Sequence, residues 1–369
     1  MPEIILQHVT KRFDKFVAVQ DLDLQIQDRG FITLLGPSGC GKTTTLRMIA
    51  GLETPTSGRI LIDGVPVFDS EKGINLPPNK RDIGFLFQNY ALWPHMTVYE
   101  NIAFGLEMLK WDKARIRKRV DELLALLKIE QFEKRYPAEL SGGQQQRVAI
   151  ARTLAPSPKV LFMDEPLSNL DAKLRQEMRT ELKRLHSDTN STFVYVTHDQ
   201  LEAMTLSTKV CLMDTGVLQQ YAPPLEIYGH PANLFVAEFV GNPTMNFIPA
   251  TVKAADGNRA SLSLLGHDAT FTAKAPLGKL TGSAVLGVRP EFLPIVQGGP
   301  LRGKTYSTLP AGMETTVKLS CGGTMLTSVV FGCVDYTVDT ELPLNIVGDN
   351  IALFDQASGQ SVGFGRVTF

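Results

Sequence analysis

The chain has 369 residues, with 37 Lys and Arg against 38 Asp and Glu, and a formal net charge of −1. This length allows two or three domains, and the near-neutral charge provides no general attraction to nucleic acid or anionic lipid. No apolar run reaches the roughly 20 residues needed to span a bilayer, and the N-terminal segment lacks a signal-peptide pattern. The four cysteines lack ligand spacing, which argues against a disulfide framework and a zinc site. We therefore expect a protein of a reducing compartment.

An apolar run at residues 31–36 leads into the sequence GPSGCGKTT, and a helical pattern follows as far as Gly51. A glycine loop between a strand and a helix, with the spacing G-x-x-x-x-G-K-[ST], predicts a P-loop that cradles the phosphates of a nucleotide. Lys42 is expected to reach the β- and γ-phosphates, and the Thr43 hydroxyl to bind Mg²⁺. Cys40 occupies a variable position and is expected to act as a spacer. The predicted nucleotide-binding residues of the loop are Gly36, Pro37, Ser38, Gly39, Cys40, Gly41, Lys42, Thr43 and Thr44.

Two further apolar runs, at residues 159–163 and 191–196, end in polar side chains and predict buried parallel strands. Ligands of open α/β sheets bind beyond the carboxyl ends of the strands, so Asp164, Glu165 and His198 are expected to meet Lys42 there. Asp164 fits the aspartate that holds a metal ion opposite a P-loop. Glu165 fits a base that polarises the attacking water. The alternative, that both acids merely cap the strand before a proline, is less favoured beside a P-loop.

The sequence LSGGQQQR at residues 140–147 reads as a loop that enters a helix N-terminus, which predicts a second anion site. One nucleotide does not need two such cradles. Between the two cradles, apolar residues at helical spacing predict a helical subdomain at about residues 92–150. Basic residues at 113–119 crowd the opposite face of one helix, and a solvated face is favoured over a contact with phosphate or lipid.

These motifs, in this order, resemble those of the ABC-type ATPases. The resemblance covers roughly residues 3–240 and includes Gln88 in the Q-loop LFQNYALWPHMTVYENI, Asp171 at the end of the D-loop LSNLD, and the switch histidine His198. It implies that Phe13 stacks on adenine, although Phe16 is close by and either could be core. It also implies that Gln88 joins Thr43 and Asp164 at the metal, and that Gln88, Glu165 and His198 are the catalytic residues.

The resemblance further implies a head-to-tail homodimer, in which the second cradle of one copy covers the ATP bound to the other copy's P-loop. Ser141 and the amides of Gly142 and Gly143 would then meet the γ-phosphate, with Gln144 and Asp171 nearby. The cofactors implied are ATP and Mg²⁺. Closure on two ATP molecules would provide a two-state element that can drive another protein.

Within that family, the stretches EPLSNLDAKLRQEMR and PLEIYGHPANLFVAEFVGNPTMNF resemble the maltose-type carbohydrate importers. That branch implies two integral membrane permease subunits, an extracellular solute-binding protein that acts indirectly, and a peripheral position on the cytoplasmic face of the membrane. The permeases would dock on a Q-loop groove expected to contain Gln88, Tyr90, Ala91, Leu92 and Trp93. The departures from the pattern are QDRGF before the first P-loop strand and Phe13 in place of a commoner Tyr or Trp.

The predicted fold is an α/β P-loop ABC ATPase domain at residues 1–240, with its helical subdomain, followed by an all-β, OB-like regulatory domain at residues 241–369. The second domain is indicated by short β-branched runs punctuated by glycine and by LGVRPE, which resembles that regulatory domain. Polyamine, iron or sulfate importers remain alternatives for the solute. A soluble ABC ATPase acting on nucleic acid is a rival of another class, and no nucleic-acid partner is expected.

Overall fold

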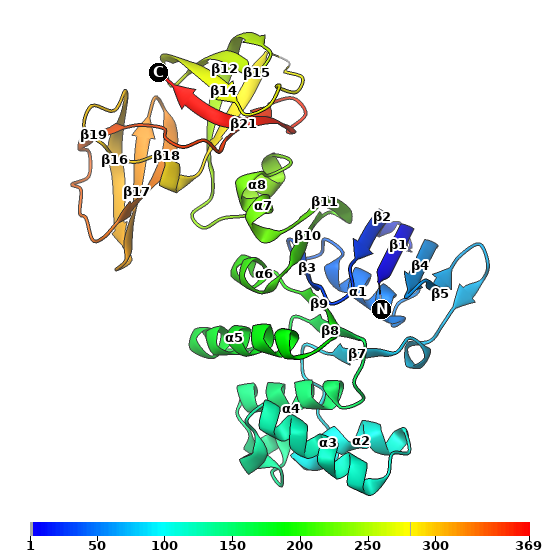
Figure 1. Cartoon of the computed structure of the whole chain (residues 1–369). Helices are drawn as coiled ribbons and strands as arrows, with labels where there is room; N and C mark the ends of the chain where they lie inside the picture. The colour runs from blue at the N-terminus through cyan, green and yellow to red at the C-terminus, as the bar shows by residue number, and fades with distance from the viewer. Residues whose placement is uncertain (1–2, 281) are drawn as a thin grey trace. The chain divides into compact units, whose positions relative to one another are not determined.

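The computed structural model describes residues 3–280 and 282–369, and the chain divides into two compact units, Met1–Pro224 and Leu225–Phe369 (Figure 1). The boundary that the sequence predicts at 240/241 falls between helix α8 (Leu234–Phe239) and strand β12 (Asn246–Asp256). Both elements lie in the second unit. Helix α7 (Pro224–Gly229) begins at the division.

The first unit contains two sheets. One is antiparallel and has the strand order β2-β1-β4-β5-β6, and the other has the order β11-β10-β3-β9-β8-β7. In the second sheet every pair from β10 to β7 is parallel, and β11 adds an antiparallel edge. The strands of the first sheet are β1 (Ile4–Phe13), β2 (Phe16–Ile26), β4 (Ser57–Ile62), β5 (Val65–Asp69) and β6 (Ile74–Asn75). Those of the second are β3 (Phe31–Leu35), β7 (Ile83–Leu86), β8 (Val160–Asp164), β9 (Thr192–Val196), β10 (Lys209–Asp214) and β11 (Val217–Ala222).

The parallel sheet is covered on both faces, which explains why every residue of β3, β8 and β9 is buried. Helix α1 (Lys42–Ala50) contributes to a core shared with the first sheet. The other face of the parallel sheet packs in a second core, to which the remaining helices of this unit contribute buried residues. These helices are α2 (Val98–Met108), α3 (Lys113–Leu126), α4 (Gly142–Leu154), α5 (Ala172–Asp188) and α6 (Gln200–Leu206).

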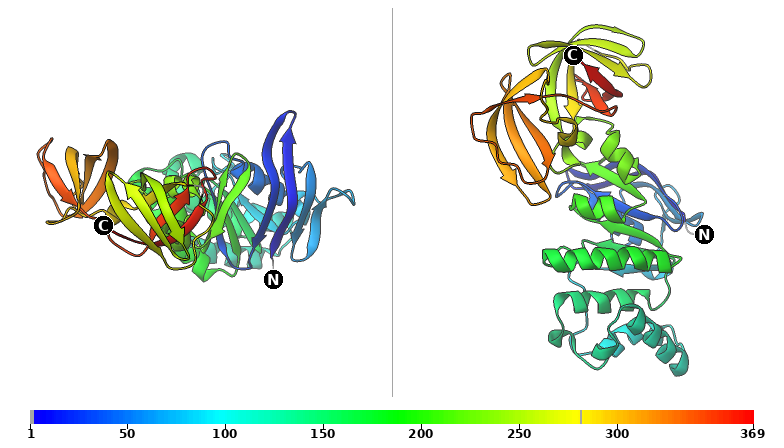
Figure 2. Two further views of the ribbon diagram at one scale, coloured as in Figure 1. Left: turned by 90° about the horizontal axis from the view of Figure 1, so that it is seen from above. Right: turned by 60° about the vertical axis from the view of Figure 1, so that its left-hand side comes forward.

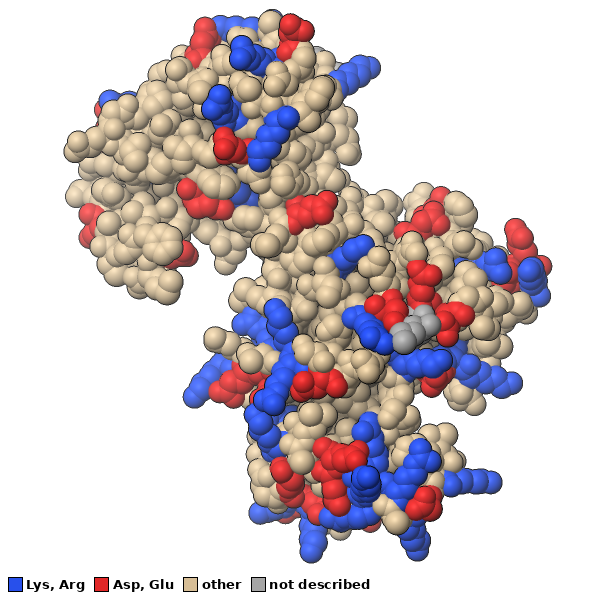
Figure 3. Space-filling model, in the orientation of Figure 1, with Lys and Arg blue, Asp and Glu red and all other residues tan. Residues whose placement is uncertain are grey.

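Helices α2, α3 and α4 form the part of the unit that lies beyond β7 in Figure 1. On α3 the apolar side chains Ile116, Val120 and Leu123 are buried, as their spacing predicts. The basic side chains of the opposite face bind neighbouring protein groups: Arg117 pairs with Asp121 and Glu133, for example. Acidic and basic side chains are interspersed over this part in Figure 3. This agrees with a solvated helix face.

The second unit consists mainly of strands, which follow the short helices α7 and α8, and this confirms the predicted all-β domain (Figure 2). Six strands close into a barrel in the order β12-β13-β14-β21-β20-β15, and four form a sheet in the order β18-β17-β16-β19. The remaining barrel strands are β13 (Arg259–Leu264), β14 (His267–Ala273), β15 (Ser283–Val288), β20 (Ile351–Asp355) and β21 (Ser361–Thr368). The sheet strands are β16 (Leu301–Pro310), β17 (Glu314–Cys321), β18 (Thr324–Phe331) and β19 (Glu341–Leu344).

Across the residues that the structure describes, no helix combines the length and the apolar character needed to cross a membrane.

Candidate functional site

The predicted P-loop connects β3 to α1 and has the backbone conformation that its glycines allow. Gly36 has φ +150° and Gly41 has φ +99°, both outside the range that side chains favour. A Cβ atom on Gly36 would lie 2.2 Å from the Met213 carbonyl oxygen, and one on Gly41 would lie 2.4 Å from that of Ala18. Glycine is required at both positions because the loop passes directly against other backbone. Gly39 has φ +80° and open space where a side chain would stand.

Lys42 is the first residue of α1, and its side chain turns back into the loop. Its Nζ donates to the carbonyl oxygens of Gly36 at 2.9 Å and Pro37 at 2.8 Å. The ammonium group is therefore held beneath the loop, and the residue is 5% exposed. The Cys40 thiol is buried in the core on the inner side of the loop, and this burial raises its pKa. Its position suits a spacer.

Asp164 ends β8 beside the P-loop helix, as the sheet topology predicts. Its Oδ1 accepts a hydrogen bond of 3.0 Å from the Thr43 hydroxyl, and its Oδ2 lies 3.3 Å from Arg47 Nη2. The carboxylate is almost completely buried, so Arg47 offsets a charge that water hardly reaches. Sequence reasoning missed Arg47. Its position four residues after Thr43, on the same helix face, was the available signal.

Glu165 and His198 meet at the carboxyl ends of β8 and β9. His198 Nδ1 lies 3.3 Å from Glu165 Oε2, and both side chains are partly accessible to solvent. Glu165 has φ +45°, an unusual conformation for a residue with a side chain. A strained backbone that aims a carboxylate at a histidine is typical of functional sites.

A cavity of about 310 Å³ lies over the P-loop and is lined by several of the predicted site residues. Phe13 and Phe16, at the ends of the β1–β2 turn, both line it, and so does Glu165. Phe13 is 43% exposed and Phe16 is 61% exposed, so neither ring belongs to the core. Both rings are therefore accessible from the cavity. The other lining residues are Ala18, Ser38, Gly39, Gly41, Lys42, Thr43 and Thr44.

Gln88 follows β7, and in this structure its contacts are with the segment after Glu165. Its side-chain Nε2 donates to Ser168 Oγ at 3.3 Å, and its backbone carbonyl accepts from Asn169 Nδ2 at 3.2 Å. Gln88 thus connects to the chain just beyond Glu165 rather than to Thr43 or Asp164. Its predicted role at the metal stays a prediction.

The groove predicted around the Q-loop needs correction, because Gln88 and Leu92 do not line the cavity found there and Leu92 packs, partly buried, against the core. Tyr90 is 6% exposed and packs in the core, so it does not line an accessible surface. Ala91 and Trp93 do line a cavity of about 440 Å³, together with Phe87, Phe104 and other residues of β7, α2 and α4. The aromatic pattern of the Q-loop could not distinguish an inward-facing ring from an outward-facing one, because the segment has no regular period.

The second predicted cradle, at the start of α4, does not line the cavity over this chain's P-loop. Ser141 is the N-cap of α4 and forms a capping box with Gln144, with N···O distances of 2.9 and 3.4 Å. Gly143 lies so close to α5 that a Cβ would meet Leu174 Cδ2 at 2.7 Å. Asp171 caps α5 by accepting from the Leu174 amide. The cradle is therefore rigid and exposed at Ser141 and Gly142.

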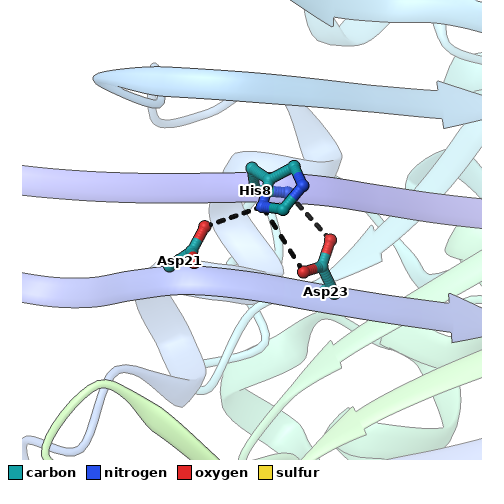
Figure 4. Close-up of side chains that lie close together, drawn as sticks. All are labelled: His8, Asp21 and Asp23. Atoms are coloured by element: carbon teal, nitrogen blue, oxygen red, sulfur yellow. Dashed lines mark hydrogen bonds and ion pairs between the residues drawn. The ribbon is translucent and has the colours of Figure 1, made fainter.

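A separate group of possible metal ligands lies on the outer sheet, away from the cavity lining. His8 on β1 faces Asp21 and Asp23 on β2 (Figure 4). His8 Nδ1 is 2.9 Å from Asp21 Oδ1, and this hydrogen bond, with the charge of Asp23, raises the pKa of His8. All three side chains are exposed and bind one another across a β-bulge. The group is explained as a cross-strand ion pair.

The parallel sheet, the P-loop and the acid pair define a P-loop nucleotide-binding ATPase. The ABC transporter family matches residues 19–168, and the MalK OB fold domain matches residues 241–293. The trehalose/maltose import ATP-binding protein MalK of Thermococcus litoralis is 44% identical over 98% of this chain and the whole of that protein. The spermidine/putrescine import ATP-binding protein PotA of Roseobacter denitrificans is 50% identical over 86% of this chain and 87% of that protein.

Solved structures agree with this likeness. The dimeric, ADP- and phosphate-bound ATP-binding cassette MJ0796 is 33% identical, with a TM-score of 0.52 over 60% of this chain and 98% of that one. The protein cbiO1 of Clostridium perfringens, part of the transporter complex cbiONQ, is 32% identical, with a TM-score of 0.56 over 61% of this chain and 89% of that one. The present chain belongs to the ABC transporter family and is an ATPase whose hydrolysis of ATP is coupled to transport.

Proposed function

We propose that the cavity over the P-loop binds ATP with Mg²⁺ and that the acid pair catalyses its hydrolysis. The loop amides and Lys42 bind the phosphates, and Phe13 stacks on adenine. A hydroxyl and a carboxylate in contact, from Thr43 and Asp164, fit the oxygen ligands that Mg²⁺ prefers. Bound there, the metal would neutralise developing charge on the phosphates.

The roles of the catalytic residues follow from their contacts. Glu165 accepts a proton from the attacking water as the general base. His198 contacts that carboxylate and orients it. Gln88 would contact the metal and the attacking water once its hydrogen bond to Ser168 is broken.

The second cradle supports the proposal of a homodimer. Ser141 and Gly142 present an exposed helix N-terminus, and neither residue lines the cavity that contains Lys42 and Glu165 of the same chain. A second copy arranged head to tail would supply the P-loop that this cradle covers, with Gly143, Gln144 and Asp171 completing the contact. Closure on two ATP molecules and reopening after hydrolysis would drive the transporter.

The transported solute is proposed to be a carbohydrate, with polyamine, iron or sulfate import as alternatives. The observation that carries this proposal is the match of the second unit to the MalK OB fold domain. This match agrees with the similarity to the trehalose/maltose import relative, the entire length of which aligns with this chain. The polyamine relative has the higher identity but aligns over less of the chain, which keeps that alternative open.

The proposed partners are two integral membrane permease subunits, bound at the groove of Ala91, Trp93 and Phe104, and, indirectly, an extracellular solute-binding protein. This places the chain on the cytoplasmic face of the membrane. An apolar groove on the surface fits a partner helix. A soluble ATPase acting on nucleic acid is disfavoured by the formal net charge of −1 and by the mixed charges on the face drawn in Figure 3.

Co-purification tests this assignment. The tagged chain, captured from detergent-solubilised membranes of its host, is expected to retain two polytopic membrane proteins. Reconstituted with those permeases, it should hydrolyse ATP faster when the associated binding protein is loaded with a maltodextrin than with spermidine. Stimulation by spermidine alone would establish the polyamine alternative. Retention of nucleic acid without any membrane protein would contradict an importer.

A further inference from the structure

Arg152 lies near the C-terminal end of α4, the helix that begins at the second cradle, and its side chain reaches the Q-loop. Its Nη1 donates to the carbonyl oxygen of Ala91 at 2.6 Å, and its Nη2 donates to that of Tyr90 at 2.7 Å. The same guanidinium lies over the Trp93 ring, 4.8 Å from its centroid. One side chain therefore contacts the loop at three places.

The loop needs this support. Tyr90 has φ +60° and Ala91 has φ +47°, so two consecutive residues with side chains occupy the left-handed region. Residues with side chains rarely occupy this region, so the loop conformation depends on the contacts that hold it. The planar guanidinium offers two parallel donors, a geometry that an ammonium group does not have. Desolvation by the surrounding protein lowers the pKa of Arg152, yet an arginine remains charged at neutral pH.

The rest of α4 is a rigid connection between the cradle and the loop. Val148, Ala149 and Ile150 are completely or almost completely buried in the core between the helices and the sheet. At its N-terminus Ser141 is fixed by the capping box, and at its C-terminal end Arg152 binds the loop that starts at Gln88. A helix of this length spans about 20 Å.

We propose that Arg152 is a positioning residue that fastens the Q-loop to the helix of the second cradle, so that cradle and loop move as one body. The mechanical consequence rests on the proposed function, because Ser141 would meet nucleotide on a second copy. A movement of the cradle on binding that nucleotide would then also move the Q-loop. The Q-loop binds Ser168, close to Glu165, and it lines the groove. Arg152 itself would touch neither nucleotide nor metal.

The test is amide hydrogen exchange of the full chain, followed separately for residues 87–97 and for α4. Replacing Arg152 with Lys should speed exchange in the loop by about tenfold or more, since bonds from a charged donor are lost, and should leave α4 unchanged. Arg119→Lys is the matched control: Arg119 also binds backbone carbonyls at the end of α4, those of Leu154 and Ala155, but not the loop. It should leave residues 87–97 at the parental rate.

A second arm tests the coupling. In a Glu165→Gln background, ATP with Mg²⁺ should alter exchange in α4 and in the loop together. With Arg152→Lys added, ATP should still form the dimer, measured by sedimentation, while the loop no longer follows α4. Arg152→Gln, whose shorter and neutral side chain cannot reach both carbonyls, should release the loop at least as much and replaces the Lys variant if that variant misfolds.

Parental loop exchange in Arg152→Lys, or equal effects of the Arg119 and Arg152 variants, would overturn the proposal. Failure of every variant to dimerise with ATP would instead contradict the proposed dimer. In that case, the exchange rates of residues 87–97 without nucleotide, compared between the Arg152 and Arg119 variants, would still show whether Arg152 holds the loop.

Discussion

The two phosphate cradles of this chain differ in how they are built. The P-loop is assembled from distant segments: Lys42 starts a helix, Asp164 ends a strand far along the chain, and the backbone of Ala18 and Met213 packs against the glycines. The second cradle is local, with Ser141 and Gln144 satisfying each other at one helix N-terminus. The P-loop has an acid pair and candidate metal ligands beside it, whereas the second cradle is a capped helix N-terminus. The difference indicates that the second cradle completes a site whose chemistry lies elsewhere.

The largest effect is expected from removing the acid of the first cradle. Glu165→Gln should bind ATP normally, lose hydrolysis by roughly 10²–10⁴-fold, and accumulate an ATP-dependent dimer, because the carboxylate acts on water and not on the phosphates. Phosphate release, nucleotide binding and sedimentation measure these three outcomes. Glu177→Gln, an exposed change on α5, is the control. Turnover near the wild-type rate would remove Glu165 from the mechanism.

Mixed dimers separate the two cradles. A dimer with Lys42→Ala on one copy and Ser141→Arg on the other contains one composite site with both defects and one with neither. Such dimers, isolated with two tags, should hydrolyse ATP at roughly half the wild-type rate, while each homodimer is inactive. The measurement is phosphate release per dimer. A strictly monomeric chain that hydrolyses ATP at the full rate would refute the sharing of sites.

A third prediction concerns the second unit, which contributes no residue to either predicted cradle. A chain cut at the predicted boundary after residue 240 would separate Ala237 of α8 from Met245 and Phe354, with which it packs, and would expose an apolar face. A chain ending at Pro224 keeps the first unit intact. It should bind ATP, yet dimerise without nucleotide about tenfold more weakly or worse, equivalent to about 1.4 kcal/mol.

Sedimentation of both lengths without nucleotide measures this change, and circular dichroism checks that the shorter chain folds. If the shorter chain is folded and dimerises as well as the full chain, the second unit has no role in holding the pair. Aggregation of the shorter chain would favour the alternative that the second unit shields the ATPase unit.

The smallest expected effect is a change in the pH dependence of stability. It concerns the end of the parallel sheet that lies opposite the acid pair and the P-loop. His186 packs against Phe31 and Phe193, near the amino ends of β3 and β9, and shares a 3.0 Å hydrogen bond with the Arg29 carbonyl. Burial lowers its pKa from 6.5, so the unfolded chain binds the proton more readily. Stability is therefore lost as the pH falls below about 6.5, the unfolded pKa.

Thermal unfolding should show this loss between pH 7.5 and pH 5.5, and in His186→Gln the loss should be smaller by about one to three degrees. ATP binding at constant pH should be the same in both proteins, because the pocket lies at the carboxyl ends of the strands. An identical pH dependence in the two proteins would show that His186 titrates normally.

Much of the architecture could be predicted because its signals are local or periodic. Apolar runs identify β3, β8 and β9, and apolar residues at helical spacing identify α3. Short β-branched runs between glycines identify the second unit as β-rich. None of these signals requires knowledge of the neighbouring elements. The rule that parallel strands present their carboxyl ends at one edge then places Asp164, Glu165 and His198 near Lys42, as the structure has them. Tyr90 was misjudged because an irregular loop has no period that tells an inward side chain from an outward one.

By itself, the sequence determined the P-loop motif, the acid pair after β8, and the loop that enters a helix at residues 140–147, since each is a pattern of residues within a few positions of one another. Why Gly36 and Gly41 must be glycine depends on the distant backbone of Met213 and Ala18. Tertiary structure alone decided that Arg47 binds Asp164, that Gln88 binds Ser168, and that Arg152 holds the Q-loop. These contacts join segments that are far apart in the chain or depend on how a long side chain turns. A guanidinium can reach many carbonyls, and packing selects which of them it binds.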